Sequence, residues 1–203
     1  TWDSAREIKE FIEVNGVKSV VIVGGGFIGM KSTEAFLDLG IKVTIVELAD
    51  RIMIRAFDET ASHLLEEKLR REGIKVITNN TVVEILERGQ KVNKVILKDG
   101  SEIDIDLVIF AIGVTPNVAL AKNTDIKINR GILVDRYMRT SVPDIYGAGD
   151  CTEAYDLLIN DNQTIAIWPT AYRQGKIAGY NMSGVKREYP GSFPMNSVEL
   201  CGV

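Results

Sequence analysis

Three glycines at a fixed spacing follow directly on a run of β-branched residues. Residues 18–23 predict a strand that enters Gly24-Gly25-Gly26-Phe27-Ile28-Gly29, and residues 27–39 predict an amphipathic helix ended by Gly40. In G-x-G-x-x-G spacing the first glycine makes the turn, the second lets a pyrophosphate approach the backbone, and the third lets helix pack on strand. The helix N-terminus adds free N–H groups and a positive dipole. The pattern therefore predicts a dinucleotide site.

An acid at the end of the next predicted strand fits the same site. Residues 42–47 form that strand, and Glu47 is placed to accept hydrogen bonds from both ribose hydroxyls of an adenosine. A carboxylate there repels a 2′-phosphate, so we expect NAD(H) to be preferred over NADP(H). Arg51 and Arg55 leave NADP(H) open as the alternative cofactor, because nearby arginines can accommodate the 2′-phosphate.

The elements that must position these residues follow from hydrophobic periodicity. The first half predicts a short lead-in helix and two parallel β-α-β steps, with a right-handed crossover between adjacent strands. A change to period two then predicts an antiparallel three-stranded meander with turns at Arg88-Gly89 and Asp99-Gly100. The further expected elements are helices over 1–15, 59–71 and 170–182, and strands over 75–77, 81–86, 91–97, 106–111 (fully buried), 132–135 and from 198.

Composition excludes several classes of function. The 203 residues are 45% hydrophobic and 26% charged with a net charge of -4, which offers no electrostatic footprint for nucleic acid or an anionic membrane. No membrane span and no signal layout is visible, so we expect a cytoplasmic chain. Cys151 and Cys201 form no C-x-x-C pair and are expected to be buried, and the single histidine, His63, cannot make a zinc site.

Two later motifs, in order after the glycine turn, carry a family resemblance. They are Ala111-Ile112-Gly113-Val114-Thr115-Pro116-Asn117 and Tyr146-Gly147-Ala148-Gly149-Asp150. With the turn and Glu47, they resemble the FAD-dependent pyridine nucleotide-disulphide oxidoreductases, which include NADH oxidases, coenzyme A disulphide reductases, rubredoxin reductases and nitrite reductase flavin domains. The resemblance implies that the first of these motifs crosses from an NAD domain to an FAD domain, and that Asp150 hydrogen-bonds the flavin ribityl chain.

The resemblance also implies roles for neighbouring residues, each with an alternative. Gly113 would keep the backbone close to bound NAD. Asp150 would end a strand before a helix, where the alternative role is a helix N-cap. The helix from Thr170 would point its N-terminus at the flavin, or would be an ordinary covering helix. Lys31 stands where many relatives have a glutamate that helps to place the nicotinamide; its alternative is a surface charge.

The expected fold is α/β, with a Rossmann-like NAD-binding domain followed by the C-terminal portion of an FAD-binding Rossmann-like domain. The expected boundaries are 1–115, 116–185, and 186–203 as the start of a truncated interface domain. Because the family's first FAD-binding unit and redox-active cysteine precede the matched region, we expect an internal fragment. It should bind NAD(H), hold FAD weakly or not at all, and form a homodimer or self-associate.

The resemblance implies hydride transfer from NADH to FAD and on to an acceptor that is oxygen, a disulphide, rubredoxin or a nitrite-reducing partner. The site residues are cofactor-binding, with no catalytic or metal-binding residue assigned. Two alternatives stay open: a non-catalytic NAD(H)-binding module, and a stand-alone nicotinamide dehydrogenase. Against the dehydrogenase, the sequence offers no histidine in a suitable loop as a proton donor.

Overall fold

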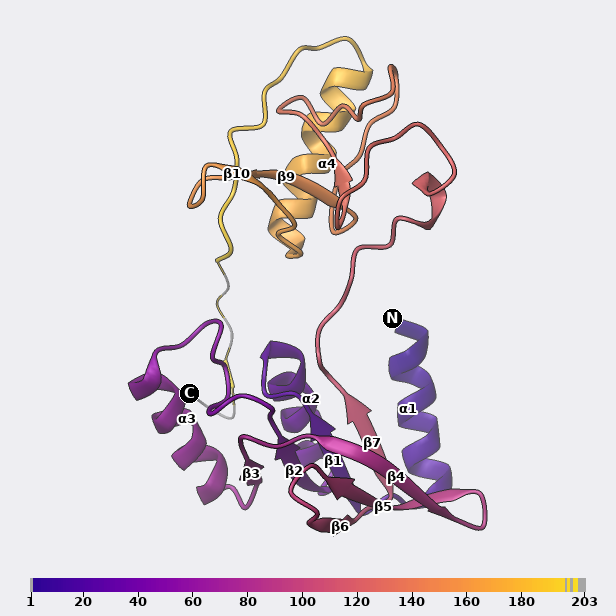
Figure 1. The fold of residues 1–203 in the computed structure, drawn as a ribbon, viewed down its shortest axis with the longest axis vertical. Coiled ribbons are helices and arrows are strands. Elements are labelled where there is room, and N and C mark those ends of the chain that lie inside the picture. The colour runs from indigo at the N-terminus through magenta and orange to yellow at the C-terminus, as the bar shows by residue number, and fades with distance from the viewer. Residues whose placement is uncertain (1, 196, 198, 201–203) are drawn as a thin grey trace. The chain divides into compact units, whose positions relative to one another are not determined.

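The computed structural model of the chain describes residues 2–195, 197, 199 and 200. The chain divides into two compact units, one of Thr1–Gly113 with Glu199–Val203 and one of Val114–Val198. Figure 1 shows the elements of each.

The first unit is built on a four-stranded parallel sheet in the order β3-β2-β1-β7. A separate antiparallel meander has the order β4-β5-β6. The parallel sheet and the meander confirm the predicted fold of this half. In chain order the elements are α1 (Trp2–Asn15), β1 (Ser19–Val23), α2 (Phe27–Asp38), β2 (Lys42–Val46), α3 (Glu59–Arg71), β3 (Lys75–Ile77), β4 (Val82–Arg88), β5 (Lys91–Leu97), β6 (Glu102–Asp104) and β7 (Leu107–Phe110).

The two central strands of the sheet are buried on both faces, as their continuous β-branched sequence requires. On one face, Val21, Val23 and Val46 pack in a single cluster with meander residues that include Val95 and Leu97. On that side the meander therefore buries the sheet. Helix α2 contacts β1 and β2, and helix α3 contacts β3. This packing fixes the carboxyl ends of β1 and β2, where the glycine turn and Glu47 lie.

Two details of the first unit differ from the sequence prediction. The strand predicted to be fully buried, β7, lies at the edge of the sheet and, among the described residues, pairs only with β1, so that Phe110 is 55% exposed. The first meander turn is Gly89-Gln90, with φ angles of 61° and 63°, so Arg88 belongs to β4. Two consecutive positive φ angles are typical of a type I′ hairpin turn, which matches the twist of its strands.

One carboxylate joins the starts of the two neighbouring strands β1 and β7. Asp106 Oδ2 accepts hydrogen bonds from the backbone N–H of Lys18 at 2.9 Å and of Ser19 at 3.0 Å, and from the Ser19 hydroxyl at 3.0 Å. The hydrogen bond from the backbone N–H of Lys18 is the main reason that the pKa of the Asp106 carboxyl is lowered. Because the pKa is lower in the folded state, the ionised carboxylate stabilises the protein at pH values above the unfolded pKa of 3.8. This stabilisation is lost as the pH falls through the lowered pKa of the folded state.

Asp106→Asn is expected to lower the melting temperature at pH 7 by about 2–4 °C, because the neutral amide accepts these hydrogen bonds more weakly. The difference between variant and parent should shrink as pH falls below 3.8, where the parent carboxylate is itself protonated. Thermal unfolding followed by circular dichroism between pH 3 and pH 7 checks this. A difference that stays constant over that range would show that the charge of Asp106 contributes nothing to stability.

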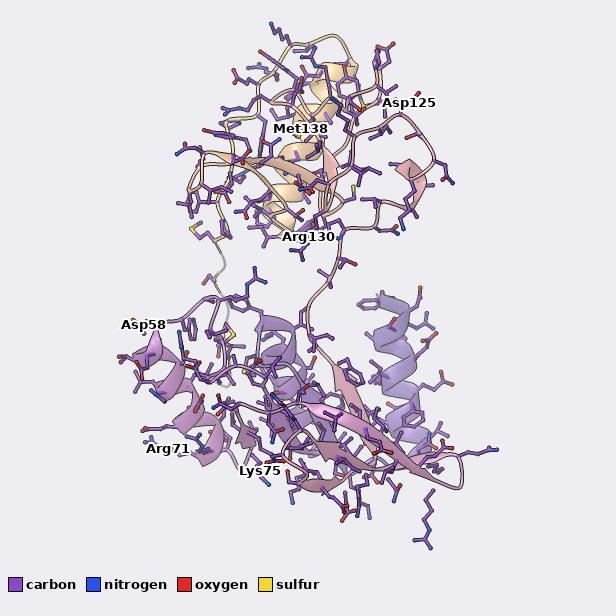
Figure 2. The ribbon with its side chains drawn as sticks, in the orientation of Figure 1. Asp58, Arg71, Lys75, Asp125, Arg130 and Met138 are labelled. Carbon is purple, nitrogen blue, oxygen red and sulfur yellow. The ribbon has the colours of Figure 1, made fainter. Side chains whose placement is uncertain are left out.

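The second unit contains a three-stranded sheet in the order β10-β9-β8, with β9 parallel to β8 and antiparallel to β10. Its core is formed by Val134, Met138, Ala154, Ala178 and Tyr189. Met138, labelled in Figure 2, has no exposed surface. The elements are the 3-10 turn η1 (Ala119–Ala121), β8 (Ile132–Leu133), β9 (Thr152–Asp156), β10 (Asp161–Gln163) and α4 (Trp168–Met182).

The second unit corrects the sequence prediction in three places. The expected helix after Asp150 is absent: a turn and then strand β9 follow instead. Helix α4 begins at Trp168, two residues before the predicted Thr170, with Pro169 in its first turn, where a missing N–H costs little. Strands β9 and β10 were not predicted. The strand expected from residue 198 falls largely outside the described residues, and Glu199 and Leu200 are not in a strand.

Candidate functional site

The first glycine of the turn has a conformation that other residues rarely adopt. Gly24 has φ of +110°, and a Cβ built on it would collide with the carbonyl oxygen of Ala111, which directly follows the neighbouring strand β7. Its N–H donates to Val46 O at 2.8 Å, so the turn is tied to the end of β2. The sharp change from strand to helix therefore needs glycine for its backbone angle and for the closeness of the neighbouring chain.

The second and third glycines have different surroundings. A Cβ on Gly26 would meet nothing within 4 Å, whereas a Cβ on Gly29 would collide with the carbonyl oxygen of Gly24. Gly29 therefore brings helix α2 close to the turn, as predicted for the third glycine. The space beside Gly26 is open on the side where the pattern predicts a pyrophosphate.

The N-terminus of α2 lies at the same point. Gly26 is its N-cap and has no side chain to accept from the first turn, which begins with Phe27, Ile28 and Gly29. The first N–H groups of a helix have no carbonyl partner within the helix, and together with the dipole they attract anions. No acidic side chain lies in this first turn to compete. These residues fit the pyrophosphate of a dinucleotide.

The Glu47 carboxylate is held by backbone on both of its oxygens. Oε2 accepts from Gly25 N at 2.5 Å, and Oε1 accepts from Ala49 N at 2.7 Å. An ionised carboxylate has about four lone-pair positions, so each oxygen keeps capacity for one further donor. Glu47 follows β2 directly, as predicted, and its orientation is set before any ligand binds. Two free positions on a fixed carboxylate suit the 2′- and 3′-hydroxyls of a ribose.

The predicted site residues Ile112 and Gly113 lie just after the end of β7, the strand that pairs with β1. A Cβ on Gly24 would lie 3.3 Å from Ile112 N, which places this segment against the turn. Ile112 is 75% exposed, and Gly113 has φ of +106°. The structure therefore brings Gly24–Gly29, Glu47, Ile112 and Gly113 to the carboxyl edge of one parallel sheet, the edge at which α/β proteins bind nucleotides.

The other two predicted site residues, Gly149 and Asp150, belong to the second unit. Gly149 has φ of +88°, and its N–H donates to Gln174 Oε1 on α4 at 2.7 Å. Its carbonyl accepts from the N–H and hydroxyl of Thr152, at 3.0 and 2.8 Å. Asp150 is exposed at the tip of this tightly bonded turn. Its carboxylate is thus presented to the surface by a fixed backbone and does not cap a helix.

Three charged residues weighed in the sequence analysis lie on the first unit. Arg51 pairs with its neighbour Asp50 at 3.1 Å, and Arg55 is exposed. Lys31, on α2, pairs with Glu34 and donates to the carbonyl of Glu199 at 3.2 Å. Lys31 thus contacts residues of its own unit, which fits the surface-charge alternative.

Sequence reasoning missed the loop between Glu47 and α3. Ile52 and Met53 are buried in it, with 0% and 3% exposure, and Met53 has a positive φ of 54°. Met53 N donates to Gly25 O at 2.8 Å, and the Ile52 side chain lies against Gly25. The only signal in the sequence was the run of three apolar residues between Arg51 and Arg55.

The described part of the chain holds neither a metal-binding cluster nor a membrane-spanning helix. Within it, no group of three or more His, Cys, Asp or Glu side chains is arranged to hold a metal ion. None of the helices described combines the length and apolar character needed to cross a bilayer.

Comparison with known proteins gives the family of the chain. The model of the family described as pyridine nucleotide-disulphide oxidoreductase matches residues 1–175. This chain belongs to the pyridine nucleotide-disulphide oxidoreductase family.

Three relatives illustrate the similarity. The chain is 36% identical over 190 residues to an NADH oxidase of Methanocaldococcus jannaschii, covering 93% of this chain and 42% of that protein. A NAD-dependent persulfide reductase from A. fulgidus superposes with a TM-score of 0.89 at 35% identity, over 94% of this chain and 35% of the other. A water-forming NADH oxidase from Lactobacillus brevis bound to NADH has a TM-score of 0.89 at 27% identity, over 98% and 44%. The chain spans less than half the length of each.

Proposed function

We propose that this chain is the NAD(H)-binding portion of a flavoprotein oxidoreductase in which hydride passes from NADH to FAD and on to an acceptor. When bound, NADH would supply the hydride and FAD would receive it. In this proposal the first unit is the NAD domain and the second is the distal part of an FAD domain. Family membership and the NADH-bound relative support the general role.

One observation carries the proposal: Gly26, with open space beside it, is the N-cap of α2 and directly follows Gly25, whose N–H holds the Glu47 carboxylate. In our proposal, Phe27, Ile28 and Gly29 N–H groups bind the pyrophosphate and Glu47 binds the adenosine ribose. Ile112 and Gly113 line the path towards the nicotinamide. A fluorescence titration of the chain with NADH tests this, and one saturable site per chain is expected.

The proposal includes a preference for NADH over NADPH, because a 2′-phosphate would face the Glu47 carboxylate. Glu47→Ala is expected to raise the Kd for NADH about 100-fold, since two charge-assisted hydrogen bonds of about 1.5 kcal/mol each are lost. The Kd for NADPH should stay the same or fall, because the repulsion is removed. Parallel titrations with both nucleotides check this. Equal Kd values for the two nucleotides in the parent chain would contradict the assigned role of Glu47.

The second unit supplies the flavin side of the proposal. Asp150, exposed on its bonded turn, is proposed to accept from FAD ribityl hydroxyls, and Gly149 allows the turn by its positive φ. The N-terminus of α4 adds a positive dipole end that suits a reduced, anionic flavin. The proposed acceptor is oxygen, a disulphide, rubredoxin or a nitrite-reducing partner. Self-association of the chain, as a homodimer or a larger species, belongs to the same proposal.

A further inference from the structure

The loop between β2 and α3 joins the nucleotide site to a helix that contributes no residue to it. Both backbone polar groups of Ile52 are hydrogen-bonded to α3. The Ser62 hydroxyl donates to Ile52 O at 2.8 Å, and Ile52 N donates to Glu66 Oε1 at 3.4 Å. Ser62 has 0% exposure and Glu66 4%. Asp58 and Arg71 mark the two ends of this helix in Figure 2.

These two polar side chains take positions that an amphipathic helix normally gives to apolar residues. The buried residues of α3 are Ser62, Leu65, Glu66 and Leu69, which recur at the spacing of one helix face. A buried hydroxyl and a buried carboxylate cost free energy unless they are bonded. Both are bonded to the loop, and Glu66 is also bonded to Arg70 at 3.0 Å. Leucines at these positions would bury more apolar surface but could not hold the Ile52 peptide.

The loop in turn fixes the glycine turn. The Ile52 side chain is completely buried, and its Cγ2 would lie 2.7 Å from a Cβ on Gly25. Met53 N donates to Gly25 O at 2.8 Å, while Gly25 N donates to Glu47 Oε2 at 2.5 Å. Both polar groups of the Gly25 backbone are therefore used, one by the loop and one by the carboxylate that would bind ribose.

The same loop also holds the second oxygen of that carboxylate. Ala49, at the start of the loop, donates to Glu47 Oε1 at 2.7 Å. Asn79 N donates to Ala49 O at 2.8 Å, so this end of the loop is tied to the chain after β3. A shift of the loop would move Ala49 N and Gly25 together, and the carboxylate would lose its fixed direction.

Resting on the proposed function, we propose that Ser62 and Glu66 are positioning residues for the adenosine end of the NAD(H) site. Through Ile52 and Met53 they hold Gly25 and the Glu47 carboxylate in the orientation that accepts two ribose hydroxyls. They thereby set both the affinity for NADH and the discrimination against NADPH. A preorganised site binds more tightly because less ordering is left for the binding step.

The test compares Ser62→Ala, Glu66→Ala and the double variant with Glu67→Ala in the 203-residue chain. Glu67 is the matched control, since it lies next to Glu66 but its side chain is 59% exposed, and among the described residues its one ion pair is with Arg71 at 3.4 Å. The Kd values for NADH and NADPH are measured by fluorescence titration, well below the melting temperature of each variant. Ser62→Ala removes one hydroxyl, so it carries the test alone if Glu66→Ala does not fold.

Each single variant is expected to raise the Kd for NADH 3- to 10-fold, while the Kd for NADPH rises less, so that the preference for NADH falls. Glu67→Ala should leave both values unchanged. A purely structural role would lower the melting temperature but leave the ratio of the two Kd values at that of the parent, and this would overturn the inference. If the parent itself does not bind NADH, the proposed function fails. If Glu47→Ala loses NADH affinity while Ser62→Ala does not, only this inference fails.

Discussion

Gly26→Ala is expected to fold with the stability of the parent chain and to bind NADH about 100-fold more weakly. The stability should be retained because the added Cβ meets nothing within 4 Å and Gly26 has an ordinary φ of -86°. The affinity should fall because the methyl group would occupy the space through which the pyrophosphate approaches the backbone. Two lost charge-assisted hydrogen bonds of about 1.5 kcal/mol each correspond to about 100-fold in Kd.

Paired measurements of melting temperature and NADH Kd check this prediction. Gly179→Ala is a matched control, since it also adds a Cβ in open space, but on α4 in the second unit. The control should bind NADH as the parent does. If Gly26→Ala binds NADH as tightly as the parent chain does, the backbone at Gly26 does not contact the pyrophosphate.

Gly24→Ala is expected to lower the stability of the chain by about 2–4 kcal/mol, or by roughly 5–15 °C in melting temperature. Two costs add at this position: φ of +110° is unfavourable for alanine, and the new Cβ would collide with the Ala111 carbonyl. The collision is with backbone, which cannot move aside as a flexible side chain can. To relieve the collision, the backbone just after β1 and the backbone just after β7 would have to move apart.

Gly73→Ala separates the two costs. Gly73 also has a positive φ, of 82°, but a Cβ there meets nothing within 4 Å, so only the conformational cost of about 1 kcal/mol applies. Chemical unfolding with urea gives the stability of each variant. Equal losses for Gly24→Ala and Gly73→Ala would show that the close approach of Ala111 is unimportant to the fold.

The glycine turn could be predicted from the sequence because each part of it depends on local features. Gly24 follows β-branched residues, Gly29 stands three residues after Gly26, and both positions have steric reasons to lack a side chain. The position of Glu47 followed from the length of β2 alone. Such features can be recognised from spacing along the chain, whereas the close approach of Ala111 to Gly24 is non-local and is seen only in the structure.

The errors have non-local causes. The apolar residues of β7 suggested full burial, but burial depends on neighbours, and β7 has a partner only on the β1 side. Strand β9 includes Glu153 and Asp156, both buried, so its apolar pattern is weak. Glu153 is satisfied by Gly131 N at 2.6 Å and by Asn129 at 3.2 Å, far away in sequence. Asp150 was therefore wrongly placed before a helix.

The residues that hold Glu47 in its orientation could not be predicted from the sequence either. Ser62 and Glu66 lie in a helix rich in charge, where polar residues ordinarily face solvent. Their burial is explained by their hydrogen bonds to the backbone of Ile52, which the sequence pattern does not indicate. The sequence predicted which residues can bind the nucleotide, and the structure adds which residues hold them.

The most direct test of the account is a two-dimensional amide NMR spectrum of the labelled chain recorded during titration with NADH. We expect the largest shift changes at the N–H groups of Gly26, Phe27, Ile28 and Gly29, with changes at Gly25 and Ala49 as ribose binds Glu47. The second unit should respond weakly. Saturable NADH binding whose shift changes avoid the glycine turn would contradict the account.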